Sequence, residues 1–188
     1  MIGAVLAGGA GRRLRVPSKA AVELAGRPLV AYPVAALASV CERVAVVCKP
    51  ATELPPLDGV ERWDEPELPQ HPLVGISHAL EQADEPVLVC AADMPFVTAD
   101  ACRTLLAAAG AGGGSNAAVA VAGGVLQPVF GVYAPPALDA FRAANPDAPL
   151  TTTVEALEPV RVALPPALVR SVNTPEELAE AEAELAGA

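Results

Sequence analysis

The sequence predicts an α/β protein with three layers, in which a mostly parallel, Rossmann-like sheet carries helices on both faces. Apolar runs of strand length alternate with longer helical patterns along the 188 residues, and this alternation is typical of βαβ units. Hydrophobic residues make up 53% of the chain but aromatic residues only 3%, so we expect small aliphatic side chains between the layers. The length suits one domain, and we see neither an internal repeat nor a domain-sized break, so residues 1–188 are expected to form a single domain.

The predicted strands are continuous apolar runs. The first covers residues 2–7 and ends at a glycine-rich turn. The others cover residues 43–48, 86–91, 116–122 and 129–133. Parallel strands that are covered on both faces are apolar throughout rather than alternating, so these runs predict a buried sheet.

The predicted helices cover residues 28–39, 74–83, 98–109, 135–144 and 174–186. Thr98 begins the third of these segments and Asn173 directly precedes the last, and at such positions a side-chain oxygen can accept from free amides of the first turn. Pro175 suits the first helical turn, because its missing N–H would have no partner there. Proline and glycine content predicts a surface loop over residues 54–72 and a flexible connector over residues 110–115.

Composition and charge exclude several classes of function. The formal net charge is −10, and this acidity together with the few aromatic residues argues against nucleic-acid binding. No apolar run approaches membrane-spanning length, and the chain enters its first strand without a signal-like leader. We therefore expect no membrane association and a cytoplasmic location. The cysteines show no C-x-x-C spacing, so we expect core thiols rather than zinc ligands or disulfides.

The glycine-rich turn that starts at Gly8 has the composition of a polyphosphate site. Glycines let backbone amides approach a phosphate closely, and neighbouring cations neutralise its charge. Four of the twelve basic residues fall between Gly8 and Lys19. The segment is neither a P-loop, because Lys19 lacks the required neighbours, nor a dinucleotide fingerprint, because the third glycine would be Leu14.

Asp93 is the predicted magnesium ligand. Ligands of open parallel sheets bind outside the carboxyl ends of the strands, and Asp93 follows the apolar run 86–91 and precedes Pro95. Mg²⁺ is commonly held by one or two carboxylates together with substrate phosphates. The alternative is an aspartate that only begins a turn.

His71 and Asn173 admit more than one interpretation. His71 begins the run His71-Pro-Leu-Val-Gly75, and no nucleophile or orienting carboxylate accompanies it at a recognisable spacing. We interpret it as a turn or substrate-contacting residue rather than as a general base. Asn173 is a helix cap, a functional residue, or both.

A series of different short motifs extends from one end of the chain to the other. In order they are Leu6-Ala-Gly-Gly9, Arg13, Lys19, Gly26-x-Pro28-Leu29, Pro72-Leu-Val-Gly75, Asp93-Met-Pro95, Gln127-Pro-Val-Phe-Gly-Val-Tyr133 and Asn173-Thr-Pro-Glu-Glu-Leu178. This series resembles the molybdenum cofactor guanylyltransferase family of the nucleotidyltransferase superfamily. The opening motif identifies only the superfamily, whereas the last two motifs are more specific to the family.

The resemblance implies a nucleotidyltransferase-type fold and the transfer of GMP from MgGTP to molybdopterin, with pyrophosphate as the second product. It implies GTP and molybdopterin as binding partners, Mg²⁺ as cofactor, and a possible protein that delivers molybdopterin. The implied contacts to the nucleotide and the metal are Leu6, Ala7, Gly8 and Gly9 at the guanine and phosphates, Arg13 and Lys19 at the triphosphate, Asp64 at the guanine, Asp93 at Mg²⁺, and Asn173 near the metal and the molybdopterin phosphate. Arg13, Lys19 and Asp93 would be the catalytic residues, and residues 127–133 would line the pterin side.

The chain also departs from the family pattern. Arg15 stands where the family has a glycine, Ser18 where it has an acidic residue, and His71 where the G-P-L-x-G motif begins with glycine. These departures leave open another nucleotidyltransferase of the same fold, a cytidylyl- or guanylyltransferase for a different phosphorylated acceptor. They also leave open a non-catalytic nucleotide-binding regulator. Phosphoryl chemistry of this kind needs no side-chain nucleophile, and the sequence offers no G-x-S-x-G elbow.

Overall fold

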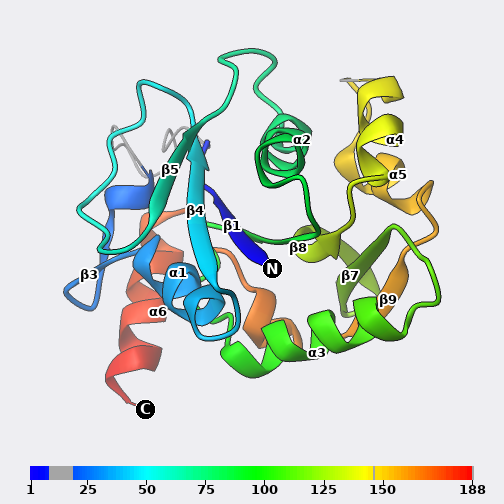
Figure 1. Ribbon diagram of the computed structural model, residues 1–188. Coiled ribbons are helices and arrows are strands. Elements are labelled where there is room, and N and C mark those ends of the chain that lie inside the picture. The colour runs from blue at the N-terminus through cyan, green and yellow to red at the C-terminus, as the bar shows by residue number, and fades with distance from the viewer. Residues whose placement is uncertain (9–18, 146, 188) are drawn as a thin grey trace.

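A central sheet organises the protein in a computed structural model that describes residues 1–8, 19–145 and 147–187 (Figure 1). The sheet has seven strands in the order β5-β4-β1-β6-β8-β7-β9. Their bounds are β1 Ile2–Leu6, β4 Arg43–Cys48, β5 Glu61–Asp64, β6 Val87–Ala91, β7 Ala117–Ala122, β8 Val125–Tyr133 and β9 Val160–Ala163. A small ribbon, β2 (Glu23–Leu24) with β3 (Arg27–Pro28), lies outside this sheet.

The sheet is mostly parallel, as the sequence predicts. Strand β8 runs antiparallel to both of its neighbours, β6 and β7, and the other neighbouring pairs are parallel. Strand β1 lies between β4 and β6, with Leu6 opposite Val47 on one side and opposite Ala91 on the other. The register therefore brings the carboxyl ends of these three strands to one edge of the sheet, where the chain leaves them toward Gly8, Lys49 and Asp93.

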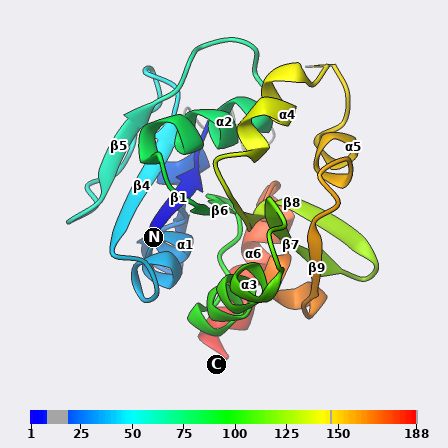
Figure 2. The same cartoon turned by 45° about the vertical axis from the view of Figure 1, so that its right-hand side comes forward.

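Helices cover both faces of the sheet, which confirms the three-layer prediction (Figures 1 and 2). Helices α1 (Ala31–Ala38) and α3 (Ala99–Ala111) share a core with Leu37, Leu105 and Phe130. Helices α2 (Pro72–Ala83), α4 (Ala137–Ala143) and α5 (Leu150–Glu155) cover the opposite face, where Leu80 and Tyr133 are buried. Helix α6 (Pro175–Ala186) packs over the small ribbon through a separate cluster that includes Leu24 and Leu29. Short 3₁₀ turns cover Lys19–Ala21 and Pro166–Val169.

The expected surface loop over residues 54–72 is wrong in its middle, because it contains strand β5. This strand reads Glu-Arg-Trp-Asp, a sequence with none of the apolar continuity of its neighbours. It forms because β4 supplies a parallel hydrogen-bonding partner from Ala45 to Cys48, and because an edge strand tolerates charged side chains on its open side.

Other elements differ from the prediction at their ends or were not predicted. Strand β8 begins at Val125, four positions before the expected start at residue 129, because its first residues pair with β7 around the Gly123-Gly124 turn. Strand β9 and helix α5 were missed. Both are short, and β9 is held by parallel pairing with β7, a contact across more than thirty residues that local patterns do not encode.

All four cysteines are free and buried. Burial raises the pKa of the Cys41 thiol to about 11 and that of Cys102 to about 12, so these thiols stay protonated and act as core residues.

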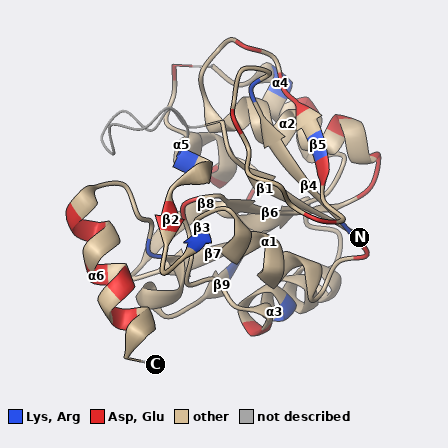
Figure 3. Cartoon of the chain, turned by 90° about the vertical axis from the view of Figure 1, so that its left-hand side faces the viewer, with Lys and Arg blue, Asp and Glu red and all other residues tan. Residues whose placement is uncertain are grey.

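Acidic side chains lie along helix α6 on the outside of the molecule (Figure 3). Among the described residues, no helix combines the length and the apolar character needed to cross a membrane.

Candidate functional site

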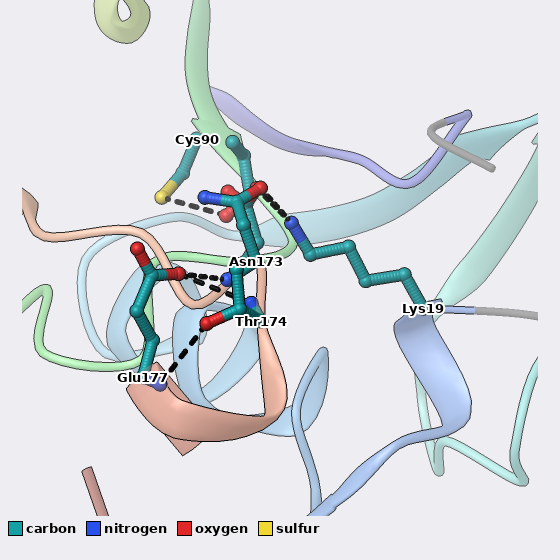
Figure 4. Close-up of polar contacts among 7 residues, drawn as sticks. Lys19, Cys90, Asn173, Thr174 and Glu177 are labelled. Atoms are coloured by element: carbon teal, nitrogen blue, oxygen red, sulfur yellow. Dashed lines mark hydrogen bonds and ion pairs between the residues drawn. The ribbon is translucent and has the colours of Figure 1, made fainter. Parts of the chain in front are cut away.

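Three polar side chains from distant parts of the chain meet at the carboxyl edge of the sheet (Figure 4). The ammonium of Lys19 donates to Oδ2 of Asp93 at 2.5 Å and to Oδ1 of Asn173 at 2.5 Å. The side chains of Lys19 and Asp93 are 14% and 22% exposed. The ion pair is therefore mostly buried but still in contact with solvent. The structure thus brings together Lys19, Asp93 and Asn173, three of the residues singled out in the sequence.

Backbone hydrogen bonds hold Asp93 and Asn173 next to each other. The carbonyl of Asp93 accepts from the N–H of Val172 at 2.8 Å, and the N–H of Ala92 donates to the carbonyl of Leu6 at 3.0 Å. The turn after β6 is therefore fixed to β1 on one side and to the segment before α6 on the other. These links set the separation of the two side-chain oxygens before any ligand binds.

A capping box orients Asn173 from below. The Thr174 hydroxyl accepts from the N–H of Glu177 at 3.2 Å, and Oε2 of Glu177 accepts from the N–H of Thr174 at 3.1 Å and from the N–H of Asn173 at 2.6 Å (Figure 4). The cap of α6 is thus Thr174, one residue after the predicted Asn173. Asn173 keeps its side chain free for Lys19 because the neighbouring threonine satisfies the helix.

The oxygens around Lys19 fit the requirements of a magnesium ion. Mg²⁺ prefers hard oxygen ligands and needs only one or two of them from the protein when a nucleotide supplies phosphates. Asp93 provides a carboxylate and Asn173 an amide oxygen, and both already hold a positive charge, the ammonium of Lys19. A divalent cation bound to these oxygens would release Lys19 toward the phosphates.

The described start of the glycine-rich turn is bound to the sheet. The N–H of Ala7 donates to the carbonyl of Val47 at 2.8 Å, and the carbonyl of Leu6 is taken by Ala92. These two hydrogen bonds hold the strand end, and the predicted contacts of Leu6, Ala7 and Gly8 to the nucleotide stay predictions. Gly9 and Arg13 lie outside the described residues, and their predicted contacts to the nucleotide stay predictions.

Asp64 and Glu65 point in different directions at the end of β5. Asp64 is half exposed and its carboxylate accepts from Nε of Arg62 at 2.7 Å. Glu65 is only 5% exposed, because side chains alternate along a strand and Glu65 shares the inner face with Trp63. The predicted guanine contact of Asp64 stays a prediction, and the structure places a second carboxylate closer to the glycine-rich turn.

Glu65 pairs with Lys49, a partly buried lysine that sequence analysis did not single out. Nζ of Lys49 lies 3.3 Å from Oε1 of Glu65 and donates to the carbonyl of Pro66 at 2.5 Å. Burial raises the pKa of the Glu65 carboxyl, and the charges of Lys49 and His78 act in the opposite direction. Inward and outward positions alternate along residues 61–65, and this alternation would place Glu65 on the inner face. The prediction is possible only if β5 is recognised as a strand.

Two other predicted segments have mainly structural contacts. Nδ1 of His71 accepts from the N–H of Leu73 at 3.2 Å and caps α2, which agrees with the turn interpretation. Within β8, Tyr133 is fully buried and its hydroxyl donates to the carbonyl of Pro128 at 2.5 Å. Gln127 and Val129 are the partly exposed residues of the 127–133 motif.

A family model described as the MobA-like NTP transferase domain matches residues 3–161. The chain belongs to this family. It is also 35% identical over 144 residues to a protein from Cereibacter sphaeroides named molybdenum cofactor guanylyltransferase, a match that covers 71% of this chain and 68% of the relative. In this nucleotidyltransferase, Lys19 and Asp93 lie within the residues that the family model matches, and Asn173 lies beyond their end.

Solved structures agree with this assignment at the level of the fold. The molybdopterin-guanine dinucleotide biosynthesis protein A of Archaeoglobus fulgidus superposes with a TM-score of 0.77 at 23% identity, over 100% of both chains. The 2-C-methyl-D-erythritol 4-phosphate cytidylyltransferase of Thermus thermophilus superposes with a TM-score of 0.71 at 22% identity, over 99% of this chain and 98% of that one. The nucleotidyltransferase thus shares its architecture with proteins that are named for different bases.

Proposed function

We propose that this nucleotidyltransferase transfers GMP from GTP to the phosphate of molybdopterin and releases pyrophosphate. The observation that carries the proposal is the meeting of Lys19, Asp93 and Asn173 at the carboxyl edge of the sheet. The named guanylyltransferase from Cereibacter sphaeroides supports guanine as the base and molybdopterin as the acceptor.

The proposed reaction forms one bond and breaks one bond at the α-phosphorus of GTP. An oxygen of the acceptor phosphate attacks the α-phosphorus, the bond to the oxygen that bridges to the β-phosphorus breaks, and its electron pair leaves with pyrophosphate. No protein group is covalently modified. The protein acts by positioning the two anions and by stabilising the charge that develops on the leaving pyrophosphate.

The residues of the cluster divide this work. A magnesium ion at Asp93 and Asn173 would supply electrostatic stabilisation of the phosphates. The Lys19 ammonium is a point charge on a flexible side chain, and in this structure it lies 2.5 Å from the carboxylate of Asp93. The side chain can turn toward the triphosphate when the nucleotide binds. Arg13, from the same segment of the sequence, is proposed as a further cation for the triphosphate.

The experiment that tests the function measures pyrophosphate release with molybdopterin as acceptor. GTP, CTP, ATP and UTP are offered separately, each with and without Mg²⁺. We expect turnover with GTP and Mg²⁺ only. Preference for CTP would move the protein to the cytidylyltransferases that share its fold, and nucleotide binding without turnover would indicate a regulator.

A further inference from the structure

The turn after β6 (residues 92–96) and the segment before α6 (residues 170–173) lie against each other. The N–H of Val172 donates to the carbonyl of Asp93 at 2.8 Å. Asp93 and Asn173 supply the two side-chain oxygens of the site, and each belongs to one of these two stretches. The spacing of the oxygens therefore depends on how firmly the turn and the segment are joined.

Arg170 joins the same two stretches a second time. Its guanidinium carbon lies 4.3 Å from the centroid of the Phe96 ring. Phe96 belongs to the turn that carries Asp93, three residues earlier in the chain. A cation above an aromatic face is attracted by the ring quadrupole, and the planar guanidinium also stacks on the ring. This contact and the Val172 hydrogen bond thus form two links between the turn and the segment.

Glu184 holds the guanidinium from α6. Nη2 of Arg170 donates to Oε2 of Glu184 at 2.5 Å, and the two side chains are 39% and 50% exposed. An ion pair of this exposure contributes little to stability by itself. It does restrict the directions that the guanidinium can take, and so favours the position above the Phe96 ring.

Apolar packing accompanies these links but does not replace them. Val172 is fully buried in the cluster that joins α6 to the small ribbon, together with Leu24, Leu29 and Ala181, and Phe96 packs against this cluster. Hydrophobic burial is non-directional, so it brings the turn and the segment together without fixing their relative position. The directional contacts, the hydrogen bond of Val172 and the stacking of Arg170, fix it.

We infer that Arg170 is a positioning residue, which stacks on Phe96 and thereby fixes the spacing of the side-chain oxygens of Asp93 and Asn173. The described contacts of Arg170 are to Phe96 and Glu184, so it acts through the turn and not on a substrate. The catalytic consequence rests on the proposed function. Mg²⁺ demands near-ideal octahedral geometry with short bonds, so a looser spacing of its two protein ligands weakens metal binding.

The first test follows hydrogen exchange of the Val172 amide in the protein without ligands, because this amide reports how often the turn and the segment separate. Arg170→Met removes the cation and keeps an unbranched side chain, and Phe96→Leu removes the ring and keeps an apolar side chain. We expect exchange about two- to fivefold faster in each variant, the effect of one exposed cation–π contact.

Two further variants show whether the ring and the cation act as one contact. Phe96→Tyr keeps the ring face, so its Val172 amide should exchange at the wild-type rate. The double variant Arg170→Met with Phe96→Leu should exchange no faster than the faster of the two single variants, because both changes remove the same contact.

The second test measures the Mg²⁺ concentration that gives half-maximal pyrophosphate release, with GTP and with molybdopterin as acceptor. Arg170→Met should raise this concentration about two- to fivefold. Saturating Mg²⁺ should restore kcat, and the KM for GTP at saturating Mg²⁺ should equal that of wild type. A residue that only stabilises the fold would leave the Mg²⁺ requirement unchanged.

Arg142→Met is the matched control. Arg142 also forms an exposed pair with a glutamate, Glu81 at 2.7 Å, but it joins α4 to α2. Neither the exchange of Val172 nor the Mg²⁺ requirement should change in this variant.

Unchanged exchange of Val172 in both Arg170→Met and Phe96→Leu would overturn the inference. Faster exchange with an unaltered Mg²⁺ requirement would also overturn it, because the contact would then have no effect on the site. Faster exchange in a protein that turns over none of the nucleotides would support the link between Arg170 and Phe96 and contradict the proposed function.

Discussion

The ammonium of Lys19 lies 2.5 Å from Oδ2 of Asp93, across 74 positions of the sequence. The same ammonium also reaches Oδ1 of Asn173 at 2.5 Å. A lysine that lies between two oxygens of a proposed cation site competes with the metal for those oxygens. Metal binding and the release of Lys19 toward the phosphates are therefore expected to be coupled.

Replacing Lys19 by Met should strengthen the binding of Mg²⁺ in the absence of nucleotide. The competing charge is removed while most of the side-chain volume is kept, and a pair of this exposure is worth about 1 kcal/mol, or about fivefold in affinity. The midpoint of the Mg²⁺-dependent rise in Tm measures the affinity. Lys19→Arg keeps the charge and serves as the control. Equal midpoints for wild type and Lys19→Met would show that Lys19 and the metal do not share a site.

The same Lys19→Met protein should bind GTP less tightly but guanosine as well as wild type does. The ammonium can act only on the phosphates, so its loss leaves the contacts of the nucleoside intact. Titrations with GTP and with guanosine provide the comparison. Parallel losses for both ligands would instead indicate that Lys19 supports the fold.

Asp93→Ala should abolish Mg²⁺-dependent pyrophosphate release and leave the fold intact. Asp93 is partly exposed at the end of β6 and fills no core position, and the backbone carbonyl that binds Val172 remains in the variant. Turnover at saturating GTP measures the loss, and urea unfolding measures stability. Turnover near the wild-type level would remove Asp93 from the metal site.

Thr174→Ala should lower stability by about 1 kcal/mol, because it removes the side-chain cap of α6. Glu177→Ala should lower it as well, and should in addition slow turnover, since Oε2 of Glu177 holds the N–H of Asn173 at 2.6 Å. Urea unfolding and turnover are compared for the two variants. A Glu177→Ala protein whose turnover falls no more than that of Thr174→Ala would show that Glu177 only caps the helix.

Glu65 should make the folded protein less stable as the pH rises. Burial raises the pKa of its carboxyl above the ordinary value of 4.5, although the charges of Lys49 and His78 oppose the shift. Above pH 4.5 the unfolded chain gives up this proton first, so the folded state binds more protons and stability falls until the pH passes the folded pKa. Glu65→Gln has no ionisable group at this position. The difference in unfolding free energy, wild type minus Glu65→Gln, should therefore decrease as the pH rises above about 4.5. A difference that stays constant over this range would show that the burial of Glu65 has no net effect on its ionisation.

Much of the architecture could be predicted from local patterns. The apolar runs that became β1, β4, β6 and β7 are buried on both faces, and continuous apolar sequence is what such strands require. The run Asn173-Thr-Pro predicted the start of α6 to within one residue, with Thr174 as the cap in place of Asn173. Asp93 could be proposed from its position after a strand, because ligands of open parallel sheets bind at that edge.

The tertiary structure decided what the local patterns do not encode. Strand β5 exists because β4 lies beside it, and its pairing places Glu65 inside and Asp64 outside. A resemblance can name an aspartate in this segment, but a shift of one residue reverses the face of a strand. Lys49 and Glu65 likewise meet only through that pairing, and Lys19, Asp93 and Asn173 only through the packing of β1 against β6 and of the segment before α6 against the turn at Asp93. The sequence by itself thus determined the layers and the kinds of residue at the site, whereas the contacts across many residues determined which side chains face one another.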